Sequence, residues 1–290
     1  MRRLDVDAYV VERAAVTEEK TMQLEGKRVL VTGSSRGIGR GVAIKLAAQG
    51  AVVAIHCLHN EEAAKATLGL VREQGSDGLI VQGDVSDPGQ TTDLVRAAAS
   101  GLGGLDVFVS NARPELPAFF APALDISIEQ WDSAMDTQAK AFLVGAREAA
   151  NHMPDGGRIL AITYATGSRT GGLQPWIGMG AAKAALKATI RYLAVALARR
   201  RITVNAISPS WTEDSVLNTL PLEAQDLIRE WHQGGWTPMG RLATPADVGD
   251  VAALLCSAEA AFITGQTLVV DGGASLMNAE VPPQLQLPSS

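Results

Sequence analysis

Short apolar runs alternate with longer helical patterns along the chain. Each apolar run spans about three to six residues between turn-forming residues, as in a buried strand, and the longer stretches carry apolar residues at helical spacing. This pattern predicts strands over residues 29–31, 51–55, 79–81, 107–109, 158–163, 203–207 and 267–270, and helices over 37–48, 61–74, 88–100, 128–153, 178–199 and 245–256. Because strands and helices alternate, we expect an α/β fold with a doubly wound, parallel seven-stranded sheet and helices on both faces.

A single Rossmann-fold domain over residues 25–277 accounts for this alternation. A chain of 290 residues, 47% of them hydrophobic, can bury one large core. Residues 1–24 form an N-terminal extension with a helical pattern over 5–15, and residues 278–290 form an irregular C-terminal tail. Residues 211–240 form an irregular insert with three tryptophans, which we interpret as a substrate flap with an apolar inner side.

The charge of the chain argues against a nucleic-acid partner. The formal net charge is −6 and the pI is about 5.3, so phosphate backbones would be repelled unless basic residues were concentrated. The tight basic run Arg199–Arg201 ends a predicted helix, where cations oppose the helix dipole. Docking of an anionic carrier or coenzyme A is the alternative role for that run.

Cysteine and histidine usage indicates a cytoplasmic protein without a metal site. Cys57 and Cys256 lie in apolar runs, as buried free thiols do in a reducing compartment. The four histidines show no metal-binding spacing. Charged residues interrupt the N-terminal stretch, which excludes a secretion signal, and no run of about 20 uncharged apolar residues predicts a membrane span.

A glycine-rich turn follows the first predicted strand and opens the first helix. In RVLVTGSSRGIG, residues 28–39, Gly33 permits the tight turn, Gly37 lets a ligand approach the backbone, and Gly39 allows close packing of helix and strand. Free N–H groups at the start of the helix would face an anion. The spacing is a variant of the dinucleotide fingerprint and lacks the Gly-Lys-Ser/Thr of a Walker loop. We therefore predict that a dinucleotide binds here through its pyrophosphate, and that the cofactor site includes Gly33, Ser35, Arg36, Gly37, Ile38 and Gly39.

The cofactor is predicted to be NADPH. NAD-specific sites place a carboxylate at the end of the second strand, and here that position falls near His59. Arg36 stands inside the glycine turn, where its guanidinium can pair with a 2′-phosphate. The alternative is that Glu61 or Glu62 holds the ribose and that Arg36 is solvated. Both glutamates, however, directly follow Asn60 and match the first turn of a helix that Asn60 caps.

Several separated segments between residues 24 and 276 resemble the short-chain dehydrogenase/reductase family. They are Thr32–Gly39, Asp84-Val85, Asn111-Ala112, 182–185, 204–209, 263–266 and 270–273. The resemblance implies that Asp84 and Val85 hold the adenine, that Asn111, Ala112 and Lys183 hold the nicotinamide ribose, and that Pro209 and Thr212 belong to the cofactor site. It also implies a homodimer or homotetramer, and the alanine-rich helices suit close packing between subunits.

The catalytic positions depart from the usual pattern of this family. The family places a tyrosine four residues before the lysine, and here Met179 precedes Lys183 at that spacing. Enoyl-acyl carrier protein reductases instead use a tyrosine seven residues before the lysine and another at the end of the fifth strand. Tyr164 matches the second position, and Trp176 occupies the first. An indole N–H donates a hydrogen bond but releases no proton at useful pH.

The preferred prediction is therefore an NADPH-dependent enoyl-thioester reductase in fatty-acid or secondary metabolism. Tyr164, Trp176 or both would donate to the enolate oxygen while Lys183 positions the cofactor. The substrate would be an acyl carrier protein or coenzyme A ester. One alternative is a carbonyl or hydroxyl oxidoreductase with Tyr164 as acid, and another is a catalytically impaired NADP(H)-binding relative in which Trp176 only packs over the pocket. The roles of Arg113 and Asp214, which replace a glycine and a threonine of the family pattern, stay open.

Overall fold

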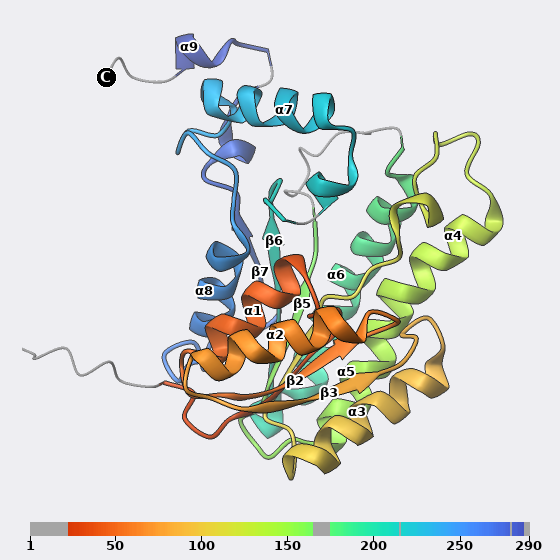
Figure 1. Cartoon of the computed structure of the whole chain (residues 1–290), viewed down its shortest axis with the longest axis vertical. Helices are drawn as coiled ribbons and strands as arrows, with labels where there is room; N and C mark the ends of the chain where they lie inside the picture. The colour runs from red at the N-terminus through yellow and green to blue at the C-terminus, as the bar shows by residue number, and fades with distance from the viewer. Residues whose placement is uncertain (1–22, 165–174, 215, 279, 287–290) are drawn as a thin grey trace, which may run out of the picture.

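The computed structural model describes residues 23–164, 175–214, 216–278 and 280–286. Within these residues one sheet contains seven strands in the order β3-β2-β1-β4-β5-β6-β7, and every neighbouring pair is parallel (Figure 1). The predicted parallel, doubly wound sheet is confirmed. The strands are β1 (Arg28–Val31), β2 (Val52–Cys57), β3 (Gly78–Gln82), β4 (Val107–Ser110), β5 (Arg158–Ile162), β6 (Thr203–Pro209) and β7 (Thr267–Val270).

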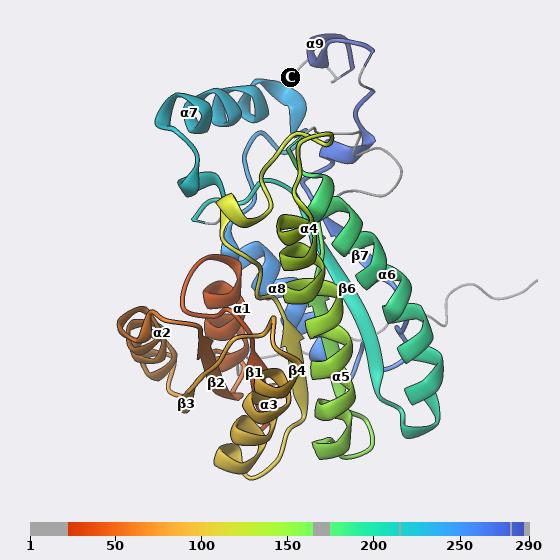
Figure 2. The ribbon, with the colours of Figure 1, turned by 90° about the vertical axis from the view of Figure 1, so that its right-hand side faces the viewer.

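Helices cover both faces of the sheet, because successive strand residues point to opposite sides. Val29 and Val31 pack with α1 (Gly37–Ala47), α2 (Glu61–Glu73) and α8 (Pro245–Cys256). Leu30 packs on the other face with α3 (Pro88–Leu102), α5 (Ala141–His152) and α6 (Ile177–Leu197), which Figure 2 shows side by side. The predicted helix over 128–153 is interrupted: α4 (Ile128–Met135) passes into α5 through a π-helical turn, Asp136–Lys140.

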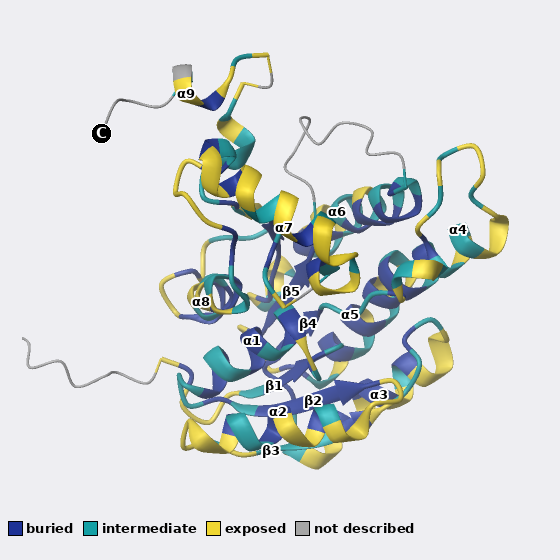
Figure 3. Cartoon of the chain, turned by 45° about the horizontal axis from the view of Figure 1, so that its top comes forward, coloured by how far each residue is buried: buried dark blue, intermediate teal, exposed yellow. Residues whose placement is uncertain are grey.

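The insert over residues 211–240 is not irregular as predicted. It contains a short 3₁₀ helix (Val216–Thr219), then α7 (Leu222–Trp231), which continues into a π-helical turn (His232–Trp236). Glu223 in the first turn and Arg229 in the last match the helix dipole. Arg229 also forms two 3.0 Å hydrogen bonds with the carboxylate of Glu213, which tie the helix to the loop after β6. Figure 3 shows exposed residues along α7, in contrast to the buried strands.

The two ends of the chain differ from the prediction in small ways. Leu24, predicted to belong to the extension, is buried in the core. The predicted helical pattern over 5–15 lies outside the described residues. The C-terminal tail contains one helical turn, α9 (Pro283–Gln286).

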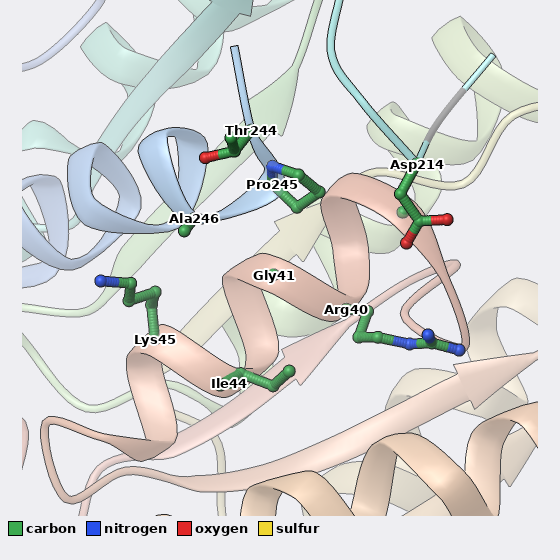
Figure 4. Close-up of a pocket in the computed structure, with 9 residues that line it drawn as sticks. Arg40, Gly41, Ile44, Lys45, Asp214, Thr244, Pro245 and Ala246 are labelled. Atoms are coloured by element: carbon green, nitrogen blue, oxygen red, sulfur yellow. The ribbon is translucent and has the colours of Figure 1, made fainter. Parts of the chain in front are cut away.

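Small residues bring α1 and α8 together. A Cβ atom on Gly41 would lie 2.5 Å from Cβ and the carbonyl oxygen of Pro245, so only glycine fits there. Beside this contact lies a hollow of about 270 Å³, lined by residues of α1, the start of α8 and Asp214 (Figure 4). Tyr164, Trp176 and Lys183 do not line this hollow, so we do not regard it as the active site.

Candidate active site

A cavity of about 1690 Å³ opens at the carboxyl ends of the strands. Pockets for one small molecule usually span roughly 300–1,000 Å³, so this cavity has room for a dinucleotide and a second molecule. Among the residues predicted to form the site, only Gly39 does not line it. The lining includes Gly33, Ser35, Arg36, Gly37, Ile38, His59, Asp84, Val85, Asn111, Ala112, Tyr164, Trp176, Lys183, Pro209 and Thr212.

The glycine turn has the backbone geometry that a dinucleotide requires. Gly33 and Gly37 have φ values of 63° and 57°, in the left-handed region that favours glycine. A Cβ atom on Gly39 would lie 2.4 Å from the carbonyl oxygen of Gly33, so this glycine lies behind the turn and permits its close packing. No side chain caps the start of α1, and its first N–H groups remain available to an anion.

The side chain of His56 positions the glycine turn through a hydrogen bond with its backbone, a role that the sequence did not indicate. It lies at the end of β2, almost fully buried, and its Nδ1 accepts a 2.8 Å hydrogen bond from the N–H of Gly33. Its Nε2 lies 3.0 Å from the carbonyl oxygen of Gly83, so the neutral ring carries its proton on Nε2. Burial lowers the pKa of His56, which favours this neutral form.

Asn111 holds the same turn from the other side. Its side-chain amide donates to the carbonyl oxygens of Thr32 and Gly33 at 2.9 and 3.0 Å. The Thr32 hydroxyl in turn accepts from the N–H groups of Asn111 and Ala112 at 2.9 and 3.1 Å. The side chain of Asn111 therefore positions the glycine turn, and no residue-spacing signal in the sequence distinguishes this role from the ribose contact that the resemblance implies.

Arg36 lies at the mouth of the cavity and forms a 2.6 Å ion pair with Glu115. Both side chains are largely exposed, and exposed ion pairs contribute only about 0–1 kcal/mol, so a 2′-phosphate could replace Glu115 at little cost. Glu61 and Glu62, the alternative ribose ligands, stand in the first turn of α2 and pair with Lys65 at 3.1 and 2.9 Å.

Lys183 lines the cavity and lies near the start of α6. Its side chain is buried, and Nζ donates a 2.6 Å hydrogen bond to the carbonyl oxygen of Ile162 at the end of β5. Burial, with a smaller contribution from the positive charge of Arg113, lowers the pKa of Lys183 to about 7. Met179, one helical turn before Lys183, is buried and offers no acidic hydrogen.

Tyr164 supplies a phenol at the carboxyl end of β5. The other tyrosine among the described residues, Tyr192, is exposed on α6, so Tyr164 is the one phenol that the structure places on the cavity. Burial raises the pKa of Tyr164, and the hydroxyl therefore stays protonated at neutral pH.

Trp176 lies at the centre of an aromatic cluster. Its ring centroid lies 5.3 Å from that of Phe119, 5.9 Å from Phe120, 5.8 Å from Tyr164 and 6.2 Å from Trp211. Only 8% of the residue is exposed. These contacts give Trp176 a packing role in the cavity wall, and its predicted role as a donor to an enolate stays a prediction.

Among the described residues, no three histidine, cysteine or acidic side chains lie together as a metal site would require. None of the described helices combines the length and apolar character needed to cross a bilayer. Cys57 and Cys256 are both buried free thiols.

Comparison with known proteins connects this geometry to a family. A sequence model of the family described as enoyl-(acyl carrier protein) reductase matches residues 33–275. Elsinochrome reductase 1 of Elsinoe fawcettii is 32% identical over 272 residues, covering 91% of this chain and all of that protein. Versicolorin reductase stcU of Emericella nidulans is 32% identical over 263 residues, covering 87% of this chain and 97% of that protein.

Solved structures agree with these sequence relatives. A short-chain dehydrogenase from Burkholderia cenocepacia in complex with NADP is 32% identical, with a TM-score of 0.78, and the match covers 87% of this chain and 99% of that one. The angucycline C-6 ketoreductase LanV with bound NADP is 32% identical, with a TM-score of 0.79, and the match covers 88% of this chain and 98% of that one.

Proposed function

This chain belongs to the short-chain dehydrogenase/reductase family, and on that premise we propose that it is an NADPH-dependent carbonyl reductase acting on a flat, fused-ring aromatic ketone. The observation that carries the proposal is the phenol of Tyr164, which lies on the same cavity as the glycine turn and Lys183. The names of the relatives support it, since they include a versicolorin reductase, a tetrahydroxynaphthalene reductase and an angucycline ketoreductase.

The residues present fit a dinucleotide with a 2′-phosphate. The uncapped start of α1 suits the pyrophosphate, and Gly37 leaves room for its approach. Arg36 can exchange Glu115 for the 2′-phosphate, beside His59 on the same rim. Bound NADPH would supply a hydride to the carbonyl carbon.

Tyr164 supplies the proton that ketone reduction needs. As hydride reaches the carbonyl carbon, the electron pair of the C=O π bond moves onto oxygen, and that oxygen takes the hydroxyl proton of Tyr164. An alkoxide is far more basic than a phenolate, so the transfer is favourable even though burial raises the pKa of Tyr164. Solvent then returns a proton to the phenolate. Lys183 lines the same cavity as Tyr164, and its hydrogen bond to the carbonyl oxygen of Ile162 fixes its position.

The aromatic wall of the cavity indicates the substrate class. Trp176, Trp211 and Trp236 line the cavity together with Tyr164. Offset and edge-to-face contacts with aromatic rings favour a flat aromatic molecule over a flexible acyl chain. The matching family model carries the description enoyl-(acyl carrier protein) reductase, but the named relatives favour the carbonyl alternative over the preferred prediction of an enoyl thioester. No observation supports an acyl carrier protein as partner.

A substrate panel with NADPH tests the proposal. We expect fused-ring ketones and quinones to oxidise NADPH, and a short enoyl thioester such as crotonyl coenzyme A to be left unchanged. Tyr164→Phe should lower kcat on the ketone by about 100-fold or more, the usual contribution of a general acid, without weakening NADPH binding. If the protein reduces the thioester and not the ketones, the proposed carbonyl reductase activity is wrong. If Tyr164→Phe turns over the ketone as fast as the wild type, Tyr164 is not the acid.

The predicted homodimer or homotetramer and the cytoplasmic location belong to the same proposal. Tyr192 and Val195 are about four-fifths exposed on α6, and an apolar surface of this kind supports contact with a second copy. Light scattering of the purified protein measures the oligomeric state directly.

A further inference from the structure

Arg113 stands where the family pattern has a glycine, at the carboxyl end of β4, and its side chain lines the cavity. One guanidinium nitrogen, Nη1, donates a 2.9 Å hydrogen bond to the carbonyl oxygen of Pro114. No carboxylate of the described residues lies within 4.0 Å of the guanidinium, and the charge of Glu115 acts on it from a longer distance. Burial lowers the pKa of Arg113, although an arginine remains charged in a protein.

Two acidic residues that line the cavity, Glu115 and Asp84, are already engaged. Glu115, two residues after Arg113, pairs with Arg36 at 2.6 Å. Asp84 accepts hydrogen bonds from the N–H and the hydroxyl of Ser86, both at 2.8 Å. Arg113 is partly buried and has no carboxylate in direct contact, so a bound anion would stabilise its charge.

Lys183 brings a second hydrogen-bond donor to the same cavity. It is buried, hydrogen-bonded to Ile162, and close enough to Arg113 for the charge of the guanidinium to lower its pKa. The aromatic wall around Trp176 lines the same cavity. A charged guanidinium and an amine beside an aromatic wall suit a ligand that combines flat rings with a negative oxygen.

We propose that Arg113 binds an ionised oxygen, a phenolate or a carboxylate, carried by the aromatic substrate. The contact selects acidic aromatic substrates over neutral ones and orients the rings against Trp176. The identity of the ligand as an aromatic substrate rests on the proposed function. The cofactor phosphates are a second source of the same oxyanion chemistry, and the experiment separates the two.

The experiment measures binding, with no need for turnover. The probe is 1-hydroxy-2-naphthoate, compared with its methyl ester, titrated into the full-length protein saturated with NADP⁺ and followed by calorimetry. We expect the wild type to bind the acid about 10- to 100-fold more tightly than the ester, the range of a charge-assisted hydrogen bond withdrawn from water. Arg113→Gln should remove that preference and leave binding of the ester unchanged.

Two companion variants complete the test. Arg113→Lys keeps the charge and should restore part of the preference, which a merely structural role would not explain. Arg96→Gln removes an exposed arginine of α3, which pairs with Glu148 and does not line the cavity, and should keep the full preference.

Two results would overturn the assignment. In the first, the wild type binds acid and ester equally well. In the second, Arg113→Gln weakens NADPH binding by the same factor and preserves the preference for the acid, which gives Arg113 to the cofactor phosphates. Neither result depends on ketone reduction, so a failure of the carbonyl reductase proposal is recognised separately by the absence of NADPH oxidation.

Discussion

The cavity can be divided into a cofactor half, around the glycine turn with His56 and Asn111, and a reacting half, around Tyr164, Lys183 and Arg113. The two halves differ in how many hydrogen bonds and ion pairs their polar side chains make within the protein. Around the glycine turn, the side chains of His56 and Asn111 each make two hydrogen bonds of 2.8–3.0 Å with the backbone. At the reacting end, Lys183 makes one hydrogen bond to a carbonyl oxygen and Arg113 makes one. Both cations lack a carboxylate within 4.0 Å among the described residues.

The cofactor half is therefore preorganised for its ligand, whereas the cations of the reacting half gain an ionic partner only when an anion binds. A satisfied buried network is rigid, so the glycine turn has its binding geometry before the cofactor arrives. A charge without an ionic partner destabilises the folded protein, and binding of an anion offsets this cost. Substitutions in the first half should therefore cost stability and cofactor affinity together, while substitutions of the cations should cost function and leave stability the same or higher.

The largest effect is expected for Gly39→Ala in the cofactor half. The new Cβ atom would lie 2.4 Å from the carbonyl oxygen of Gly33 and 2.5 Å from Nδ2 of Asn111. Relief of this clash must move the turn, so we expect a stability loss of about 3 kcal/mol and a loss of NADPH affinity of about 100-fold or more. Urea unfolding and calorimetric titration measure the two quantities.

The matched control is Gly69→Ala on α2. A Cβ atom there has no neighbour within 4 Å, and alanine is the better helix former. We expect unchanged NADPH binding and a gain of up to about 1 kcal/mol. Equal behaviour of the two variants would show that the packing of the turn does not control cofactor binding.

Lys183→Met tests the opposite expectation in the reacting half. The pKa of the buried ammonium is lowered from 10.5 to about 7, so folding disfavours the charged form. The stability that Lys183 contributes in its neutral form is present above pH 10.5 and is lost as the pH falls toward about 7. The methionine variant should lack this pH dependence and be more stable near pH 7 by about 1–3 kcal/mol, while ketone reduction falls by about 100-fold.

Urea unfolding at several pH values from about 7 to about 10 distinguishes the outcomes. A variant that is less stable than the wild type throughout this range would show that the hydrogen bond to Ile162 outweighs the cost of burying the charge.

His56→Ala should reduce stability by about 1–3 kcal/mol, because it leaves the N–H of Gly33 and the carbonyl oxygen of Gly83 without their partner. Burial lowers the pKa of His56 below 6.5, so the contribution of the neutral ring is complete above that pH and declines as the pH falls below it. The alanine variant should therefore show a flatter decline of stability in acid than the wild type. His59→Ala, at an exposed position, is the control, and an identical acid response of wild type and His56→Ala would exclude this residue as the cause.

The sequence predicts the elements of the fold well. All seven strands and the helices α1, α2, α3, α6 and α8 start and end within about two residues of their predicted bounds, because glycine, proline and capping residues mark many of them locally. The contact of His56 with Gly33 depends on the pairing of β1 with β2, and no local pattern contains it. The π-helical turn before α5 is equally invisible, since its residues read as ordinary helix.

The chemistry of the reacting half is harder to predict from the sequence. The preferred enoyl-thioester interpretation relied on Trp176 as a hydrogen-bond donor, and this role stays a prediction, since the structure shows the ring packed among other aromatic side chains. Sequence spacing places a residue near a site but does not show which atoms of its side chain face the cavity. Helix α7 was missed because three tryptophans and several turn residues obscured its amphipathic pattern. The helix begins after Pro221 and carries Arg229 in its last turn.

The smallest effect is expected for Trp176→Phe, and it sharpens the comparison at the reacting end. Phenylalanine keeps an aromatic ring beside Phe119 and Tyr164 and removes only the indole N–H and part of the ring surface. If Trp176 packs against the substrate, kcat/KM for the aromatic ketone should fall by about 2- to 5-fold, equivalent to about 0.5–1 kcal/mol, chiefly through KM. If the indole instead donates to a developing oxyanion, kcat should fall by about 100-fold or more. Trp131→Phe on α4, which does not line the cavity, should match the wild type in both constants, so the split between KM and kcat in Trp176→Phe decides between a wall and a catalytic donor.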